Sequence, residues 1–191
     1  MDGAIQLHSG LMFDLIHPDP KRILLYDIAH SLARICRFTG HVDGFYSVAE
    51  HSVYVAQIIA GRLGDRHPAI AAGLLHDAEE AYVGDVASPL KRQLTNYGAI
   101  AEGVTEAIGI RFGIDFAAWK DVVHQVDMEM LAYEAEYFMR PKEHGTESYW
   151  NLPPIPDDIK QLLGKKVLGH LPKLAYFKFM ESAGLYGVCE Q

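Results

Sequence analysis

Apolar residues recur at helical spacing along most of this chain, and this periodicity is the strongest constraint on its fold. Between Ile23 and Arg37, for example, Ile28, Leu32 and Ile35 fall on one face of a helix. The alternation that is typical of strands is weak, and only Gln6 to Phe13 could form a short extended or hairpin segment. The pattern therefore predicts an all-α, bundle-like domain.

Helix caps, prolines and glycines divide the periodic stretches. Ser47 and Glu50 have the spacing of a capping box, in which the serine oxygen accepts from a helical N–H and the glutamate reaches back. Asp115 is predicted to cap the helix that begins at Phe116. These signals predict helices at about 23–37, 47–63, 68–82, 89–108, 116–139, 157–163 and 172–182. The 191 residues suit one domain, with a core at about 23–140 and a C-terminal helical appendage at 141–191.

Composition narrows the class of partner. The formal net charge is −8, and the chain has no basic run of the kind that a nucleic-acid-binding face needs. Apolar runs such as Ala69 to Leu75 are far too short to span a membrane. The N-terminus lacks the order of a signal peptide, and Cys36 and Cys189 form no CxxC motif. We expect a soluble, cytoplasmic protein that binds neither nucleic acid nor a membrane.

Two acidic positions conflict with the pattern of their own helices. The apolar segment Ala71 to Leu75 ends in the adjacent pair His76 and Asp77, and Asp127 lies beside the apolar stripe of its predicted helix. A buried carboxylate must be protonated, paired or bound to a metal ion. For Asp127 taken alone, a solvated position at the edge of the stripe is the alternative.

A metal site accounts for these residues together with a histidine near the start of the helix at 47–63. His51, His76, Asp77 and Asp127 come from three predicted helices that an all-α core can bring together. Two imidazoles and two carboxylates would neutralise one divalent ion, with Mn, Co or Zn favoured over Fe or Mg. Such an ion would lower the pKa of a bound water and polarise a phosphoryl oxygen.

Acids and cations near the ligand positions suggest further roles. Glu80 lies four residues after His76, one turn further along the same predicted helix, and could act as a general acid or base. Asp85 follows in a turn, where it could orient a substrate hydroxyl or serve the turn alone. Arg37 and Lys91 are candidate phosphate-binding cations or surface charges. Phe38 could stack on a base or pack in the core.

The set of a single histidine, a His-Asp pair and a distant aspartate resembles the HD-domain metal-dependent phosphohydrolases. Residues 47–56 (SVAEHSVYVA) and 74–91 (LLHDAEEAYVGDVASPLK) are similar to the corresponding segments of bacterial HD-domain 5′-deoxynucleotidases. Arg37 and Phe38 occupy the place of an Arg-Trp pair that lies beside the substrate in those enzymes. The resemblance covers about residues 28–134. The replacement of tryptophan by Phe38 keeps an aromatic face and loses the indole N–H.

The resemblance implies hydrolysis of 2′-deoxynucleotides, either 5′-monophosphates or, as in related phage and biosynthetic enzymes, triphosphates, notably of adenine. It also implies that the protein forms a homo-oligomer and that its binding partner is a small-molecule nucleotide, the substrate. The implied roles are metal ligation by His51, His76, Asp77 and Asp127, acid or base catalysis by Glu80, phosphate binding by Arg37, and contact with the sugar or a metal water by Asp85. His41, in the loop before the predicted helix at 47–63 that carries His51, could contact substrate. The alternatives are hydrolysis of guanosine tetraphosphate or another nucleotide, and a non-catalytic nucleotide-binding module.

Overall fold

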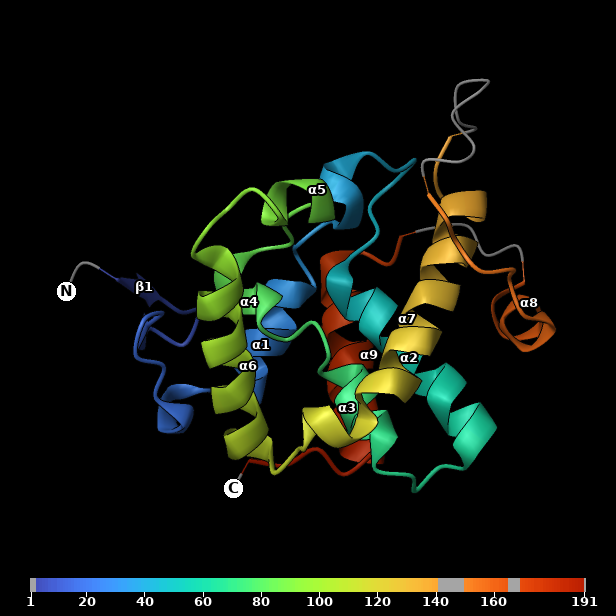
Figure 1. Cartoon of the computed structure of the whole chain (residues 1–191). Helices are drawn as coiled ribbons and strands as arrows, with labels where there is room; N and C mark the ends of the chain where they lie inside the picture. Colours follow the sequence, from blue (N-terminus) through green and yellow to red (C-terminus); the bar gives the residue numbers. More distant parts are fainter. Residues whose placement is uncertain (1–2, 141–149, 165–168, 191) are drawn as a thin grey trace.

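The structure is a computed structural model that describes residues 3–140, 150–164 and 169–190 (Figure 1). Its elements are the strands β1 (Ala4–Gln6) and β2 (Met12–Asp14), the 3-10 helices η1 (Pro20–Arg22) and η2 (Arg37–Gly40), and the helices α1 (Leu25–Leu32), α2 (Val48–Leu63), α3 (Ala69–Leu74), α4 (Glu80–Val83), α5 (Ser88–Lys91), α6 (Tyr97–Phe112), α7 (Phe116–Tyr137), α8 (Asp157–Leu163) and α9 (Pro172–Leu185). The predicted all-α class is confirmed. The two strands form the antiparallel hairpin that the N-terminal segment suggested.

Helix α2 lies at the centre of the bundle, where it packs against α3, α7 and α9 (Figure 1). The Ser47 side chain accepts a hydrogen bond from the Glu50 N–H at 3.2 Å, so the predicted serine cap is confirmed. The second half of the predicted capping box, in which the Glu50 side chain reaches back to the Ser47 N–H, is wrong. The Glu50 carboxylate instead accepts from the Tyr54 hydroxyl and from the backbone N–H of His170. The start of α2 is therefore tied to the C-terminal part of the chain.

The predicted continuous helix at 68–82 is interrupted. Helix α3 ends at Leu74, residues 75–79 form a turn, and α4 begins at Glu80. The His76 ring donates from Nδ1 to the Gly73 carbonyl at 2.8 Å, and side-chain bonds of this kind compete with the helical ladder. A Cβ on Gly73 would lie 2.5 Å from the Ile59 side chain, so glycine permits the close approach of α3 to α2.

Other predicted boundaries also differ, including the ends of α6 at Phe112 and of α9 at Leu185. The helix predicted at 23–37 ends at Leu32, because Cys36 and Ser47 form a β-bridge and the Arg37 N–H bonds the Tyr46 carbonyl. The helix predicted at 89–108 is divided by the exposed residues 92–96 into α5 and α6. The long helix α7 ends at Tyr137 rather than 139. Its predicted cap is confirmed, since the Asp115 side chain accepts from the Ala118 N–H at 3.0 Å.

Both C-terminal helices contribute to the core. Helix α9 packs against α1, α2 and α3, and buries Ala175, Phe179 and Ala183 in the hydrophobic cluster, to which α8 adds Ile159 and Leu163. The predicted appendage at 141–191 therefore contributes α8 and α9 to the core, while 141–149 and 165–168 lie outside the described residues. Among the residues that the structure describes, no helix combines the length and the apolar character needed to cross a membrane.

Candidate metal centre

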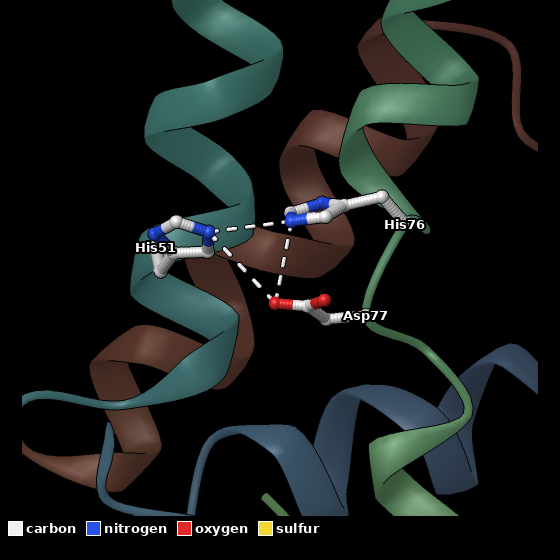
Figure 2. Close-up of side chains that lie close together, drawn as sticks. All are labelled: His51, His76 and Asp77. Carbon is white, nitrogen blue, oxygen red and sulfur yellow. Dashed lines mark hydrogen bonds and ion pairs between the residues drawn. The ribbon is translucent and has the colours of Figure 1, made fainter. Parts of the chain in front are cut away.

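The fold brings two histidines from separate elements to one point. His51 lies in the first turn of α2 and is fully buried, whereas His76 lies in the turn after α3. Their Nε2 atoms are 3.3 Å apart, and Figure 2 shows the two rings facing each other. The short distance between α2 and α3 at Gly73 makes this approach possible.

Two carboxylates join the imidazoles. Asp77 Oδ2 lies 3.2 Å from His76 Nε2 and 3.8 Å from His51 Nε2 (Figure 2). Asp127, from the middle of α7, places Oδ1 at 3.1 Å from His51 Nε2 and 3.7 Å from His76 Nε2. Metal–nitrogen and metal–oxygen bonds of about 2.0–2.2 Å place neighbouring ligand atoms about 3–3.5 Å apart. His51, His76 and Asp77 therefore have the donor types and spacing of a metal site. Asp127 adds a carboxylate beside both histidines, and the four residues are called here the ligand cluster.

The second nitrogen of each imidazole is held by an acceptor. His51 Nδ1 lies 2.6 Å from Glu134 Oε1, and His76 Nδ1 lies 2.8 Å from the Gly73 carbonyl. A carbonyl and a carboxylate can only accept, so both Nδ1 atoms carry the proton and both Nε2 atoms face the cluster. This arrangement orients imidazole ligands in metalloproteins. The cluster is also open on one side, since the Asp127 side chain keeps 30% of its exposure.

Glu134 was missed by the sequence analysis. It is fully buried, and its two oxygens accept from His51, from the Tyr46 hydroxyl at 2.8 Å and from Arg37 at 3.0 Å. Glu134 lies seven residues after Asp127, two turns along the same face of α7, and this spacing was the available signal. Arg37, Tyr46, His51 and Glu134 are called here the anchoring network.

The charges of the cluster shift one another. Burial lowers the pKa of His76, but the Asp77 and Asp127 carboxylates outweigh it and raise this pKa well above its ordinary value. His51 likewise has a raised pKa, because Glu134 and Asp127 outweigh burial and the Arg37 charge. The pKa values of Asp77 and Asp127 are lowered against the effect of burial by the two histidines. Ion pairs thus hold these four residues together in the metal-free protein.

A second group of acids adjoins Asp77. Ligand atoms of Asp77, Glu79 and Glu80 lie within 4.8 Å of one another. Burial and the nearby Asp77 charge raise the pKa of Glu80 to about 9 and that of Glu79 to about 7. Burial also raises the pKa of Asp85. We call Glu79, Glu80 and Asp85 the acidic group.

The acidic group corrects one interpretation of the sequence and adds a residue. Glu80 was predicted to share a helix with His76, but it reaches the cluster because the turn at 75–79 brings the start of α4 beside Asp77. Glu79, for which the sequence predicted no role, belongs to the same group. Among the described residues, Glu79 Oε2 and Glu80 Oε2 are buried side-chain oxygens without a hydrogen-bond partner. Such atoms are costly unless a ligand, a proton or a cation uses them.

The predicted substrate-contact residues lie in two places. Arg37 bonds Asp77 at 3.4 Å and Glu134 at 3.0 Å, so its guanidinium adjoins the cluster. Lys91, in α5, pairs with Glu80 Oε1 at 3.1 Å. The Phe38 ring lies under the Arg37 guanidinium, 5.4 Å from its carbon to the ring centroid. His41 is exposed at the end of η2, where its backbone N–H bonds the Phe38 carbonyl.

The backbone of η2 is strained beside Arg37. Phe38 and Thr39 have φ values of 56° and 55°, in the left-handed region, and neither is a glycine. A β-branched residue such as Thr39 adopts this conformation rarely, at a cost of about 1–3 kcal/mol. The surrounding contacts hold the strain, so the direction of the Phe38 side chain is fixed by the fold.

Fold and site together define an all-α protein with a candidate metal centre of two histidines and two carboxylates. No protein-family model matches the chain. It is 34% identical over 181 residues to the uncharacterized protein YfdR of Escherichia coli, covering 93% of this chain and 92% of that protein. It is 39% identical over 137 residues to the uncharacterized protein RCAP_rcc00048 of Rhodobacter capsulatus, covering 67% and 69%. The chain belongs to the same family as YfdR.

Proposed function

We propose that this protein is a divalent-metal-dependent phosphohydrolase of the HD-domain type that acts on 2′-deoxynucleotides. The observation that carries the proposal is the ligand cluster, in which each histidine Nε2 atom lies 3.1–3.8 Å from an oxygen of Asp77 and of Asp127, with the acid Glu80 beside it. Mixed nitrogen and oxygen donors without thiolate suit Mn, Co or Zn. When bound, the ion would activate water and withdraw charge from a phosphoryl oxygen.

The protein's own residues would handle protons and orientation. Glu80 has a pKa of about 9, so it is protonated near neutral pH and can give its proton to the leaving oxygen. Its Oε2 atom has no hydrogen-bond partner within the described part of the chain, and is therefore available for that transfer. Lys91 at 3.1 Å fixes the other oxygen, Oε1.

Two cations near the cluster support phosphate binding. Arg37 is held by Asp77 and Lys91 by Glu80, so positive charge is available to a dianionic group. Burial raises the pKa of Asp85, and the positive charges of Arg37 and Lys91 partly offset this rise. We assign it contact with a substrate hydroxyl. The choice of deoxynucleotides as the substrate class, rather than phosphate esters in general, rests on the resemblance of residues 47–56 and 74–91 to bacterial HD-domain 5′-deoxynucleotidases.

The deciding experiment is a panel of deoxynucleoside mono- and triphosphates, incubated with the purified protein and Mn²⁺, Co²⁺ or Zn²⁺. We expect release of phosphate from monophosphates, or of tripolyphosphate from triphosphates, and loss of activity with chelator. Guanosine tetraphosphate and ribonucleotides belong in the same panel, because turnover of these alone would replace the deoxynucleotide assignment. Absence of turnover for every nucleotide, with metal content verified, would leave a non-catalytic binding module.

A further inference from the structure

Two aromatic rings from distant parts of the chain meet beside the ligand cluster. Phe38 in η2 and Trp150, which follows α7, lie with their ring centroids 6.2 Å apart and their planes inclined by 15°. Neither ring belongs to the hydrophobic core, and the Trp150 residue retains 37% of its exposure. A nearly parallel pair of rings outside the core is a surface on which another flat ring can stack.

The pair is connected directly to the cluster. The Arg37 guanidinium lies over the Phe38 ring on one side and bonds Asp77 on the other. The loop after η2 is also joined to the end of α7, because the Asp43 N–H donates to the Phe138 carbonyl at 3.3 Å. A molecule with a phosphate at Arg37 and a flat ring a few ångströms away would therefore reach the aromatic pair.

The left-handed backbone at Phe38 and Thr39 sets the direction of the Phe38 ring. A ring placed by a strained turn gains no core packing in return, which distinguishes Phe38 from buried aromatics such as Phe13 and Phe179. Aromatic side chains next to a cationic site are the usual platform for bases, since every base has a π-face.

We propose that Trp150 and Phe38 together form the base-binding surface, on which the nucleobase stacks while its phosphate lies at Arg37 and the ligand cluster. This proposal rests on the proposed function and extends it to a residue, Trp150, outside the segments that carried the resemblance. Stacking tolerates every base, so this surface provides affinity, about 5- to 100-fold per stacked base, with little discrimination between bases.

The chain contains two tryptophans, which allows a direct test. Trp119, near the start of α7, packs edge-on against His67 and belongs to the partly buried shell of the core. In Trp119→Phe, Trp150 is the single remaining tryptophan and gives all the tryptophan fluorescence. In the matched control Trp150→Phe, Trp119 gives all of it. Each variant is titrated with dAMP, dCMP and 2-deoxyribose 5-phosphate, with Zn²⁺ and again with chelator. N-Acetyltryptophanamide corrects for light absorbed by the bases.

We expect dAMP and dCMP to quench Trp150, and the base-free sugar phosphate to leave its emission unchanged. The Trp119 signal should not respond. Phe38→Ala in the Trp119→Phe background should weaken nucleotide binding about 5- to 100-fold, with the melting temperature retained, since neither ring is in the core. Equal quenching by the sugar phosphate, or an equal response of Trp119, would overturn the base-binding surface.

The outcome is separable from that of the proposed function. Quenching of Trp150 without hydrolysis of any nucleotide supports the base-binding surface and removes the catalytic assignment. Hydrolysis of deoxynucleotides without any change in Trp150 fluorescence supports the catalytic assignment and overturns the base-binding surface, because the base then binds elsewhere.

Discussion

The anchoring network and the acidic group both adjoin the ligand cluster, but the pKa values of their buried carboxylates shift in opposite directions. In the network, both oxygens of Glu134 have partners, and Arg37 and His51 lower its pKa against the effect of burial. In the acidic group, burial dominates, and the pKa of Glu80 rises to about 9. The network therefore holds charged groups that orient His51, whereas burial in the acidic group favours protonated carboxylates. This difference agrees with the proposed roles of positioning for the network and proton transfer for Glu80.

The comparison is tested most severely at Glu80. Glu80→Gln keeps the size of the side chain and removes the acid, so kcat should fall about 10²- to 10⁴-fold while metal affinity stays the same. Glu102→Gln, at an exposed position of α6, is the matched control. Steady-state kinetics and metal titration on both variants provide the measurement. Full activity of Glu80→Gln would contradict its role.

A substitution of Asp127 tests metal ligation itself, a role distinct from those of the anchoring network and the acidic group. Asp127→Ala removes an oxygen that lies 3.1 Å from His51 Nε2, and should weaken metal binding by more than about 100-fold. Asp121→Ala makes the same change at an exposed position of α7 and should bind metal normally. Calorimetric titration with Zn²⁺ measures both. Unchanged affinity in Asp127→Ala would show that α7 supplies no ligand.

Glu134 tests the network. Glu134→Gln removes the charge that holds His51 and Arg37, so metal affinity should fall about 10- to 100-fold. The metal-free protein should lose about 3 kcal/mol of unfolding free energy, because Arg37 stays buried without its main partner. Urea denaturation and metal titration check the two effects, with Glu136→Gln, exposed on the same helix, as control. If Glu134→Gln instead reproduced the kinetics of Glu80→Gln, the division of roles between the network and the acidic group would be wrong.

The last prediction concerns pH. His51 and His76 have raised pKa values in the metal-free protein, and a metal ion requires their unprotonated Nε2 atoms. Binding therefore releases protons, and Zn²⁺ affinity should be at least about 10-fold higher at pH 8 than at pH 6. The same shifts stabilise the metal-free fold at low pH, and this contribution is lost as pH rises through the raised values. Chelator competition at several pH values measures the first trend; a flat profile would contradict it.

The sequence predicted the helical class, the cap of α2 and four residues that the fold brings together. It could do so because Asp77 and Asp127 conflict with apolar helical patterns, and such conflicts are visible without a structure. The turn at 75–79 was not predictable from periodicity, since it depends on the bond from His76 to the Gly73 carbonyl. Glu134 was missed because its seven-residue spacing from Asp127 was the available signal, and α7 carries several other acids from which this spacing had to be singled out. Trp150 was missed because its pairing with Phe38 spans distant segments.

The tie between Glu50 and His170 has a consequence for the order in which the site is made. Glu50 precedes His51, and its carboxylate receives the His170 backbone N–H, while α9 covers the flank of α2 with Phe179 and Ala183. The helix that carries the first histidine therefore lacks part of its packing while the ribosome is still translating residues beyond α7. Metal loading should accordingly follow the synthesis of α9, as a late event in the maturation of the protein.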